Sequence, residues 1–176
     1  MKRLLIALFG FGLLPGCSDD DSYPEMTVTS PAFGDGETIP LRHTCDGEGI
    51  SPPLSLSEVP DETASFAVIM DDPDAPGGTY THWVLYRLPG RNRFIAEDQD
   101  RNGGDGALQG TNSSGKTGYL GPCPPRGKEH HYVFRVYALD RSPALEAGAT
   151  RAKLKSAMKG HIVGYGELVG LYRRPG

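Results

Sequence analysis

Polar side chains able to titrate or to donate hydrogen bonds stand beside three apolar runs of this sequence. They are Asp72, Asp74, His82, His130, His131 and Tyr132. An imidazole N–H and a phenol O–H can donate to the oxygens of a phosphate-like group, while a carboxylate orients an imidazole and favours its charged form. If the three runs are neighbouring strands, the sequence predicts a small pocket for an anion where their ends meet.

Six short segments have the length and the periodicity of β-strands. They span residues 26–30, 54–57, 65–70, 82–88, 131–139 and 164–172. The run 65–70 is almost continuously apolar, as in a buried strand, whereas 131–139 alternates aromatic and β-branched residues with others. Because two prolines and two glycines follow soon after, we expect the strand 65–70 to end before Asp71.

One helix is expected, within residues 143–160. Leu145 and Leu154 belong to an apolar stripe of this segment. Thr150 can cap the N-terminus of the helix, and Gly160 can end its last turn. The sequence therefore predicts an all-β domain with peripheral helices.

Composition limits both the number of domains and the kind of partner. A chain of 176 residues, of which 38% are hydrophobic, suits one domain and a leader. The 24 glycines and 15 prolines interrupt short apolar runs, as in a β-protein with many turns. The formal net charge is −4, and lysines and arginines never form a longer run than a pair. A basic stripe for nucleic acid is therefore excluded.

The first 17 residues have the pattern of an export signal. Lys2 and Arg3 precede an apolar stretch, residues 4–14, that is too short to span a bilayer as a helix. Gly16 and Cys17 then resemble a bacterial lipobox, in which the leader is removed and the cysteine is lipid-modified. An ordinary secretory signal with an incidental cysteine is the alternative.

These features divide the chain into a leader with its lipobox cysteine at 1–17, a polar tether at 18–25 and one domain at 26–176. The polar run after Cys17 cannot pack in a core, which is typical of a tether. We therefore expect the protein to be exported and held at the cell envelope by a lipid anchor. Ser18 follows the cysteine, which favours the outer membrane if the host is Gram-negative.

Export would place the two remaining cysteines, Cys45 and Cys123, in an oxidising compartment. Such a pair can form a disulfide there. Two buried free thiols are the alternative, because the sequence does not fix the separation of the two Cα atoms. We favour the disulfide.

Five groups of motif residues follow one another along the chain. They are Thr44-Cys45-Asp46-Gly47 with Ile50-Ser51-Pro52-Pro53-Leu54; Asp72-Pro73-Asp74-Ala75-Pro76; His82-Trp83; Gly121-Pro122 with Pro124-Pro125, Gly127 and His130-His131-Tyr132; and Tyr137-Ala138-Leu139-Asp140. Their order, over residues 26–173, resembles the phosphatidylethanolamine-binding protein family, and more narrowly its bacterial Raf-kinase-inhibitor-like branch. The resemblance implies two packed, mainly antiparallel sheets. It implies neither a metal nor a cofactor.

The resemblance also assigns residues to the pocket. It implies an anion-binding set of Asp72, His82, His130 and Tyr132. It implies a pocket rim or wall made of Asp74, Pro76, Trp83 and Pro122. His131 stands where the family usually has arginine, and strand alternation turns it away from the face of His130. We therefore infer no fixed charge at that position.

We expect a non-catalytic binding protein. Its ligand would be small and anionic, for example a phosphoryl head group, with Asp72 orienting a histidine. The first alternative is an inhibitor of a protein partner such as a protease, acting through the loops 71–80 and 110–128. An assay of protease inhibition separates the two functions.

A hydrolase is the second alternative, and the sequence leaves catalysis open. It contains no Gly-x-Ser-x-Gly motif, and Ser113-Ser114-Gly115 lacks the strand–turn–helix context of one. No oxyanion hole can be located either. A metal site built from Asp72, His82 and His130 would lack the tight spacing of common metal motifs.

Overall fold

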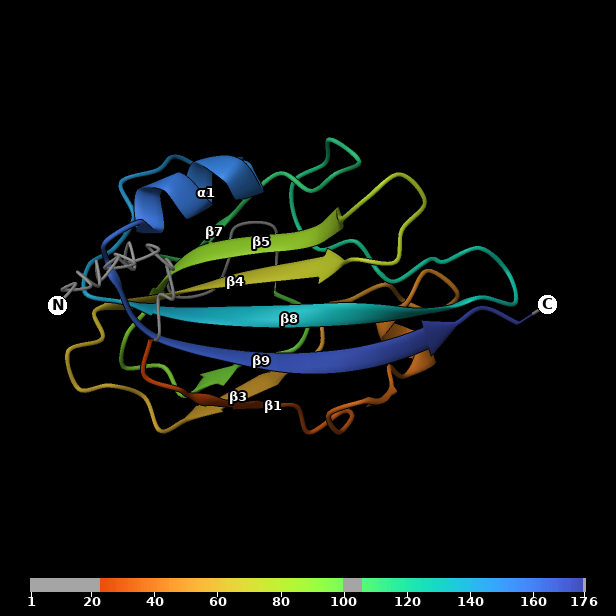
Figure 1. Cartoon of the computed structure of the whole chain (residues 1–176), viewed down its shortest axis with the longest axis horizontal. Coiled ribbons are helices and arrows are strands. Elements are labelled where there is room, and N and C mark those ends of the chain that lie inside the picture. The colour runs from red at the N-terminus through yellow and green to blue at the C-terminus, as the bar shows by residue number, and fades with distance from the viewer. Residues whose placement is uncertain (1–22, 100–105, 176) are drawn as a thin grey trace, which may run out of the picture.

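The computed structural model of the chain describes residues 23–99 and 106–175 (Figure 1). The expected leader 1–17, with Cys17, and residues 18–22 of the expected tether lie outside the described residues. Within the described ranges, no helix is long and apolar enough to cross a membrane.

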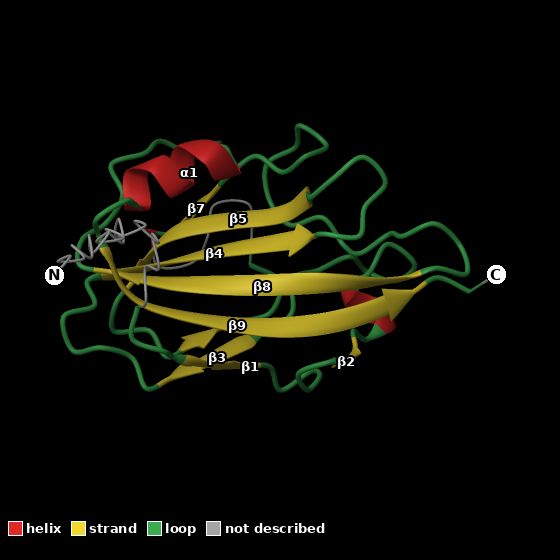
Figure 2. Ribbon diagram, in the orientation of Figure 1, coloured by secondary structure: helices red, strands yellow, loops and turns green. Residues whose placement is uncertain are grey.

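Six strands form the larger sheet, in the order β2-β9-β8-β4-β5-β7 (Figure 2). They are β2 Glu37–Thr38, β4 Ser65–Asp72, β5 Tyr80–Pro89, β7 Leu108–Gln109, β8 Glu129–Leu139 and β9 Ile162–Arg173. All neighbouring strands are antiparallel except β2 and β9, which are parallel. Every residue of β4 is buried, in keeping with its continuous apolar run and its place between β8 and β5.

Three strands form the smaller sheet. They are β1 Thr27–Thr29, β3 Leu54–Ser57 and β6 Phe94–Ile95, and both pairings are antiparallel. Leu54 and Leu56 of β3 share one apolar core with Phe66 of β4 and Phe134 of β8. The two sheets therefore pack face to face, and the expected class of two packed, mainly antiparallel sheets is confirmed.

One helix, α1 Arg151–Met158, covers the outer face of the larger sheet (Figure 2). Its buried residues Leu154 and Met158 join a second apolar core with Ile69 and Val84 of the sheet. The helix thus covers part of the face that points away from the smaller sheet.

The helix is shorter than the segment expected to contain it. Thr150 caps its N-terminus as predicted, since the Thr150 side chain accepts a hydrogen bond from the backbone amide of Lys153. Leu145 precedes the helix and packs on the second core from a loop. The prediction that Leu145 belongs to the apolar stripe of the helix was therefore wrong. A short 3-10 helix, η1 Leu41–His43, was not anticipated.

β4 extends further than the sequence predicted. The ladder continues through Asp71, which pairs with Thr81, to Asp72, which pairs with Tyr80. The break therefore begins at Pro73, which has no amide hydrogen to donate, and the expectation of an earlier end was wrong. Because strand side chains alternate, the two aspartates point to opposite faces of the sheet.

Asp71 lies on the outer face, and its side chain is only 1% exposed. The Thr81 hydroxyl donates to its Oδ1 atom at 2.8 Å. Arg135 and Arg151 donate to its Oδ2 atom at 3.2 and 2.9 Å. A buried carboxylate needs such partners, and here they connect α1 to β4 and β8.

Glycines on β9 allow the smaller sheet to approach. A Cβ atom on Gly166 would lie 2.3 Å from the Met26 carbonyl oxygen and 2.8 Å from a methyl carbon of Val28. The N-terminal segment runs beside β9 there, because the Met26 amide donates to the Tyr165 carbonyl at 2.7 Å. Only a residue without a side chain permits this contact of two backbones.

Replacing Gly166 with alanine should therefore push β1 away from β9. We expect Gly166→Ala to lower the free energy of unfolding by about 2 kcal/mol through overpacking, measured by urea denaturation. Gly34→Ala is the matched control, because its new Cβ would meet only the flexible end of Glu37. An equal loss of stability in both variants would contradict this account of the two sheets.

Candidate functional site

Three neighbouring strands of the larger sheet, β4, β5 and β8, each have one end on the side of the sheet nearest the C-terminus (Figure 1). Asp72 ends β4, and His130 lies at the start of β8. The Asp72 Oδ2 atom accepts a hydrogen bond of 2.8 Å from the His130 Nδ1 atom, and both side chains are 5% exposed. The Asp74 backbone amide donates to the other carboxylate oxygen at 2.8 Å. Both oxygens of this buried carboxylate therefore have a partner.

A β-bulge turns His82 toward the same face. Met70 pairs with Trp83 and Asp71 with Thr81, so β5 has one more residue here than β4. Alternation from the buried Trp83 would send His82 to the outer face. The bulge instead brings it inward, where its ring meets that of Tyr132 edge to face with centroids 5.2 Å apart.

Tyr132 lies two residues after His130 and shares its face. It is completely buried, and its hydroxyl forms no hydrogen bond with the described residues. The hydroxyl is close to the Asp72 carboxylate without meeting hydrogen-bond geometry, and burial followed by the charge of Asp72 raises the pKa of Tyr132. The phenol is therefore neutral, with the Asp72 carboxylate and the Cys123 backbone as its nearest polar neighbours.

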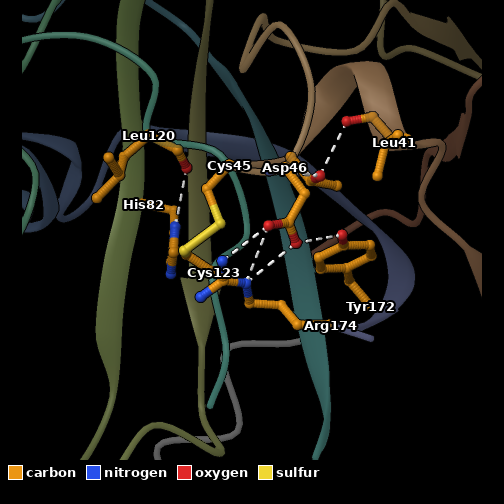
Figure 3. The surroundings of a disulfide bond; sticks show 9 residues. Leu41, Cys45, Asp46, His82, Leu120, Cys123, Tyr172 and Arg174 are labelled. Atoms are coloured by element: carbon orange, nitrogen blue, oxygen red, sulfur yellow. Dashed lines mark hydrogen bonds and ion pairs between the residues drawn. A yellow bond between two sulfur atoms is a disulfide. The ribbon is translucent and has the colours of Figure 1, made fainter. Parts of the chain in front are cut away.

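A loop fixes the orientation of His82 from outside the strands. The Leu120 carbonyl oxygen lies 2.8 Å from the His82 Nδ1 atom (Figure 3), and the Leu120 amide donates to the His82 carbonyl at 3.0 Å. Burial lowers the pKa of His82 below its ordinary value of 6.5, against smaller opposing effects of this hydrogen bond and of Asp72. His82 is therefore mainly neutral at neutral pH.

A disulfide holds this loop. Cys45 and Cys123 are joined, with their Cα atoms 5.4 Å apart, and the Cys45 amide donates to the Pro122 carbonyl at 3.1 Å. Nearby, the Tyr119 hydroxyl donates to the His43 carbonyl at 2.8 Å. The segment that orients His82 is thus tied to the loop after η1 (Figure 3).

An ion pair lies beside the disulfide (Figure 3). Arg174 donates to both carboxylate oxygens of Asp46, and the Tyr172 hydroxyl donates to Oδ2 at 2.7 Å. Arg174 first, and Tyr172 second, lower the pKa of Asp46 to about 2. Tyr172 pairs with His130 across β8 and β9, so this cluster supports the strand that carries His130.

The residues expected at the rim lie in different surroundings. Asp74 is exposed, and its Oδ2 atom accepts from the backbone amide and the Nδ1 atom of His131 at 2.8 and 2.7 Å. These bonds lower the pKa of Asp74 and join the loop after β4 to β8. Pro76 is exposed in that loop, whereas Pro122 is buried. Because His131 is bonded to Asp74 and His130 to Asp72, the two imidazoles point away from each other, as strand alternation predicted.

Trp83 belongs to the core rather than to a ligand surface. It is completely buried, and its indole N–H donates to the Gln109 side-chain oxygen at 2.8 Å. Its ring meets Tyr119 edge to face at 5.6 Å between centroids. Trp83 therefore forms a wall behind the loop that carries Leu120.

Sequence reasoning missed three supports of the site. The Leu120 carbonyl is a backbone group, so its residue type carries no signal. Asp46 belonged to a recognised motif, but its partner Arg174 stands far away near the C-terminus of the chain. The bulge at His82 does not change the hydrophobic pattern of the sequence. It becomes visible only in the pairing register of β4 and β5.

The serines considered for hydrolysis are engaged in a turn. The Ser113 hydroxyl oxygen accepts from the Thr81 amide at 2.8 Å, and the Ser114 hydroxyl donates to Asn112 at 2.6 Å. No group of at least three His, Cys, Asp or Glu side chains in the described part of the chain is placed to hold a metal ion. The arrangement that the geometry does offer is the Asp72–His130 pair with His82 and Tyr132 beside it.

Fold and site together define a small two-sheet domain with a buried Asp–His pair at one end of its larger sheet. The sequence profile of the family described as phosphatidylethanolamine-binding protein matches residues 29–173. The chain belongs to the phosphatidylethanolamine-binding protein family.

Two archaeal relatives match over nearly their whole length. A UPF0098 protein of Methanothermobacter thermautotrophicus is 50% identical over 151 residues, covering 85% of this chain and 99% of that protein. A second, from Pyrococcus abyssi, is 42% identical over 175 residues, covering 97% of this chain and 96% of the relative. The family is therefore shown by sequence across most of the chain.

Solved structures agree. A putative phosphatidylethanolamine-binding protein homolog from Chlamydia trachomatis is similar with a TM-score of 0.79 at 42% identity, covering 85% of this chain and 98% of that one. E. coli YbcL, described as a new member of the mammalian PEBP family, gives a TM-score of 0.78 at 34% identity, covering 84% and 98%. The two-sheet fold is thus that of the family.

The buried, mainly neutral state of His82 should make stability depend on pH. An unfolded chain takes up a proton on this residue below pH 6.5, whereas the folded protein resists it, so the free energy of unfolding should fall as the pH drops below 6.5. The slope from one such proton is at most about 1.4 kcal/mol per pH unit. Urea denaturation between pH 5 and 8 should show this slope, and His82→Gln should reduce it. An unchanged slope in the variant would contradict the assignment.

Removing the disulfide should cost stability, because it closes a loop with a sequence separation of 78 residues. Chain entropy predicts a loss of about 4–5 kcal/mol in a Cys45→Ser, Cys123→Ser double variant. Denaturation with and without a reducing agent checks this, since reduction should destabilise the parent protein alone. Equal sensitivity of both proteins to the reductant would argue against the bond.

Proposed function

We propose that this protein binds a phosphate-like anionic group in the pocket formed by His82, His130 and Tyr132, without catalysis, and that Asp72 orients His130. The observation that carries the proposal is the buried Asp72–His130 hydrogen bond of 2.8 Å beside a buried phenol whose hydroxyl has no partner among the described residues. A polar group is not left buried and unpaired without cost, and an anion oxygen would pair with this hydroxyl.

Family membership supports the same ligand class, since a phosphoryl head group carries the oxygens that imidazolium and phenol donors recognise. The charge of His82 also favours an anionic ligand when its imidazole is protonated. Because burial lowers the pKa of His82, its cationic form grows only as the pH falls. Affinity for a fully ionised anion should therefore weaken as the pH rises through the histidine range.

The location of the protein is part of the proposal. A lipid on Cys17 would hold the domain at the cell envelope, on the outer membrane if the host is Gram-negative. A lipid head group or an envelope metabolite would then be within reach of the pocket. The pattern of residues 1–17 supports this location.

Titration calorimetry with phosphate and phosphoethanolamine tests the pocket. We expect His130→Ala to weaken binding by about tenfold or more, because it removes a partner able to make a charge-assisted hydrogen bond. His131→Ala is the matched control, since the neighbouring histidine points to the other face of β8 and should keep the parent affinity. Equal affinity in the parent and His130→Ala proteins would remove His130 from the site.

Replacement of the lipobox cysteine tests the location. In the native host, the parent protein should sediment with membranes and incorporate labelled palmitate. Cys17→Ser should lose the label and leave the membrane fraction, because other parts of the leader cannot supply a thioether-linked lipid. Membrane association without label in the parent would favour the ordinary secretory signal or another mode of attachment.

A further inference from the structure

A second cavity lies on the outer face of the larger sheet, beside α1 (Figure 1). Its volume is 450 Å³, and none of its lining residues belongs to the proposed anion pocket. The lining includes three cationic side chains, one buried carboxylate and two tyrosine rings. These are Arg135, Arg151, Lys155, Asp71, Tyr137 and Tyr165.

Asp71 holds two guanidinium groups in place in this cavity. Arg151 uses its Nε atom for the buried carboxylate, at 2.9 Å, and Arg135 uses its Nη1 atom, at 3.2 Å. The Nε atom of Arg135 donates to Glu167 at 2.9 Å. Both Nη atoms of Arg151 and the Nη2 atom of Arg135 form no hydrogen bond with the described residues. These N–H groups are oriented by Asp71 and remain available to a ligand.

Lys155 adds a third positive charge. It lies one helical turn after Arg151 on α1, on the same side of the helix. It is exposed, and it takes part in no ion pair of the described residues. Three cations therefore stand beside two carboxylates, those of Asp71 and Glu167. The cluster keeps a positive charge, which attracts an anion.

Two tyrosine rings form the wall next to these cations. Tyr137 and Tyr165 are paired across β8 and β9, and their ring centroids lie 5.2 Å apart at an interplanar angle of 48°. Tyr137 follows Arg135 by two residues, so both side chains are on the outer face of β8. A ring can pack against a tyrosine face, while an acidic group attached to it reaches the neighbouring guanidinium groups.

We propose that this outer-face cavity binds a ring compound that carries a carboxylate. The planar carboxylate would accept paired hydrogen bonds from the Nη atoms of Arg151, the geometry that a guanidinium group favours. The ring would pack against Tyr137 and Tyr165. Ligand pockets commonly measure about 300–1,000 Å³, so the cavity has room for one such compound. Acidic sugars such as glucuronate and aromatic acids such as benzoate both have this chemistry.

NMR of the tyrosine rings in the full chain tests the proposal. Benzoate, glucuronate, acetate and benzamide are titrated separately into protein labelled with ¹³C-tyrosine. We expect saturable shifts of the Tyr137 and Tyr165 signals with benzoate, glucuronate or both, and the arm that binds identifies the source. Acetate lacks the ring and benzamide lacks the charge, so each should bind about tenfold more weakly or less. No saturable shift with benzoate or glucuronate, or equal affinity for acetate, would overturn the proposal.

Lys155→Ala separates ligand binding from the structural contacts of Asp71. Since Lys155 makes no contact with Asp71, α1 should stay attached to the sheet, while affinity for the carboxylate should fall about threefold or more. Lys153→Ala is the matched control, because Lys153 is exposed on the same helix and does not line the cavity. An equal loss of affinity in the two variants would show general attraction to the helix, and it would contradict a site in the cavity.

His130→Ala distinguishes this site from the proposed anion pocket. The shifts of Tyr137 and Tyr165, and the affinity that they report, should be the same in this variant as in the parent protein, because the two sites are on opposite faces of the sheet. Loss of these shifts in His130→Ala would assign the carboxylate to the other pocket and overturn the proposal. Shifts that persist in a protein unable to bind phosphate would support the outer-face site alone.

Discussion

A hydrogen bond of 2.8 Å between the Asp72 carboxylate and the His130 imidazole joins the ends of β4 and β8 in a nearly dry environment. A buried carboxylate is costly unless each of its oxygens is paired. Here one oxygen takes the histidine and the other the Asp74 amide. The loop after β4, the tautomer of His130 and the position of the Tyr132 hydroxyl all depend on where this carboxylate lies.

The same stretch of β4 also positions side chains on the outer face of the larger sheet. Asp71 points outward, is bonded to Arg135 and Arg151, and so ties α1 to the sheet. The extra residue of β5 opposite this pair then brings His82 to the inner face. The disulfide is remote from β4 in sequence, but it holds the loop whose Leu120 carbonyl completes the orientation of that histidine. Strand alternation, one bulge and one covalent bond together determine how the side chains of Asp72, His82 and His130 are placed.

Periodicity and motif order were enough to predict much of this arrangement. The alternation of residues 131–139 correctly separated His131 from the face of His130 and Tyr132, and the apolar run 65–70 correctly identified the central strand. The end of β4 was predicted too early, because Asp71 and Asp72 look like turn residues until their partners across the sheet are known. The bulge, the Leu120 carbonyl and the Asp46–Arg174 pair depend on register, backbone position and long-range contact, which a local pattern does not contain.

An anion bound as proposed would meet the Nε2 atoms of His82 and His130, because the Nδ1 atom of each ring already faces a protein oxygen. Titration of phosphate into ¹⁵N-histidine-labelled protein, followed by NMR of the imidazole nitrogens, measures this at each ring separately. We expect saturable shifts of the Nε2 signals of His82 and His130 at one common concentration, with the signals of His131 and His161 unchanged. Shifts confined to His131 or His161, or none at saturating phosphate, would contradict it.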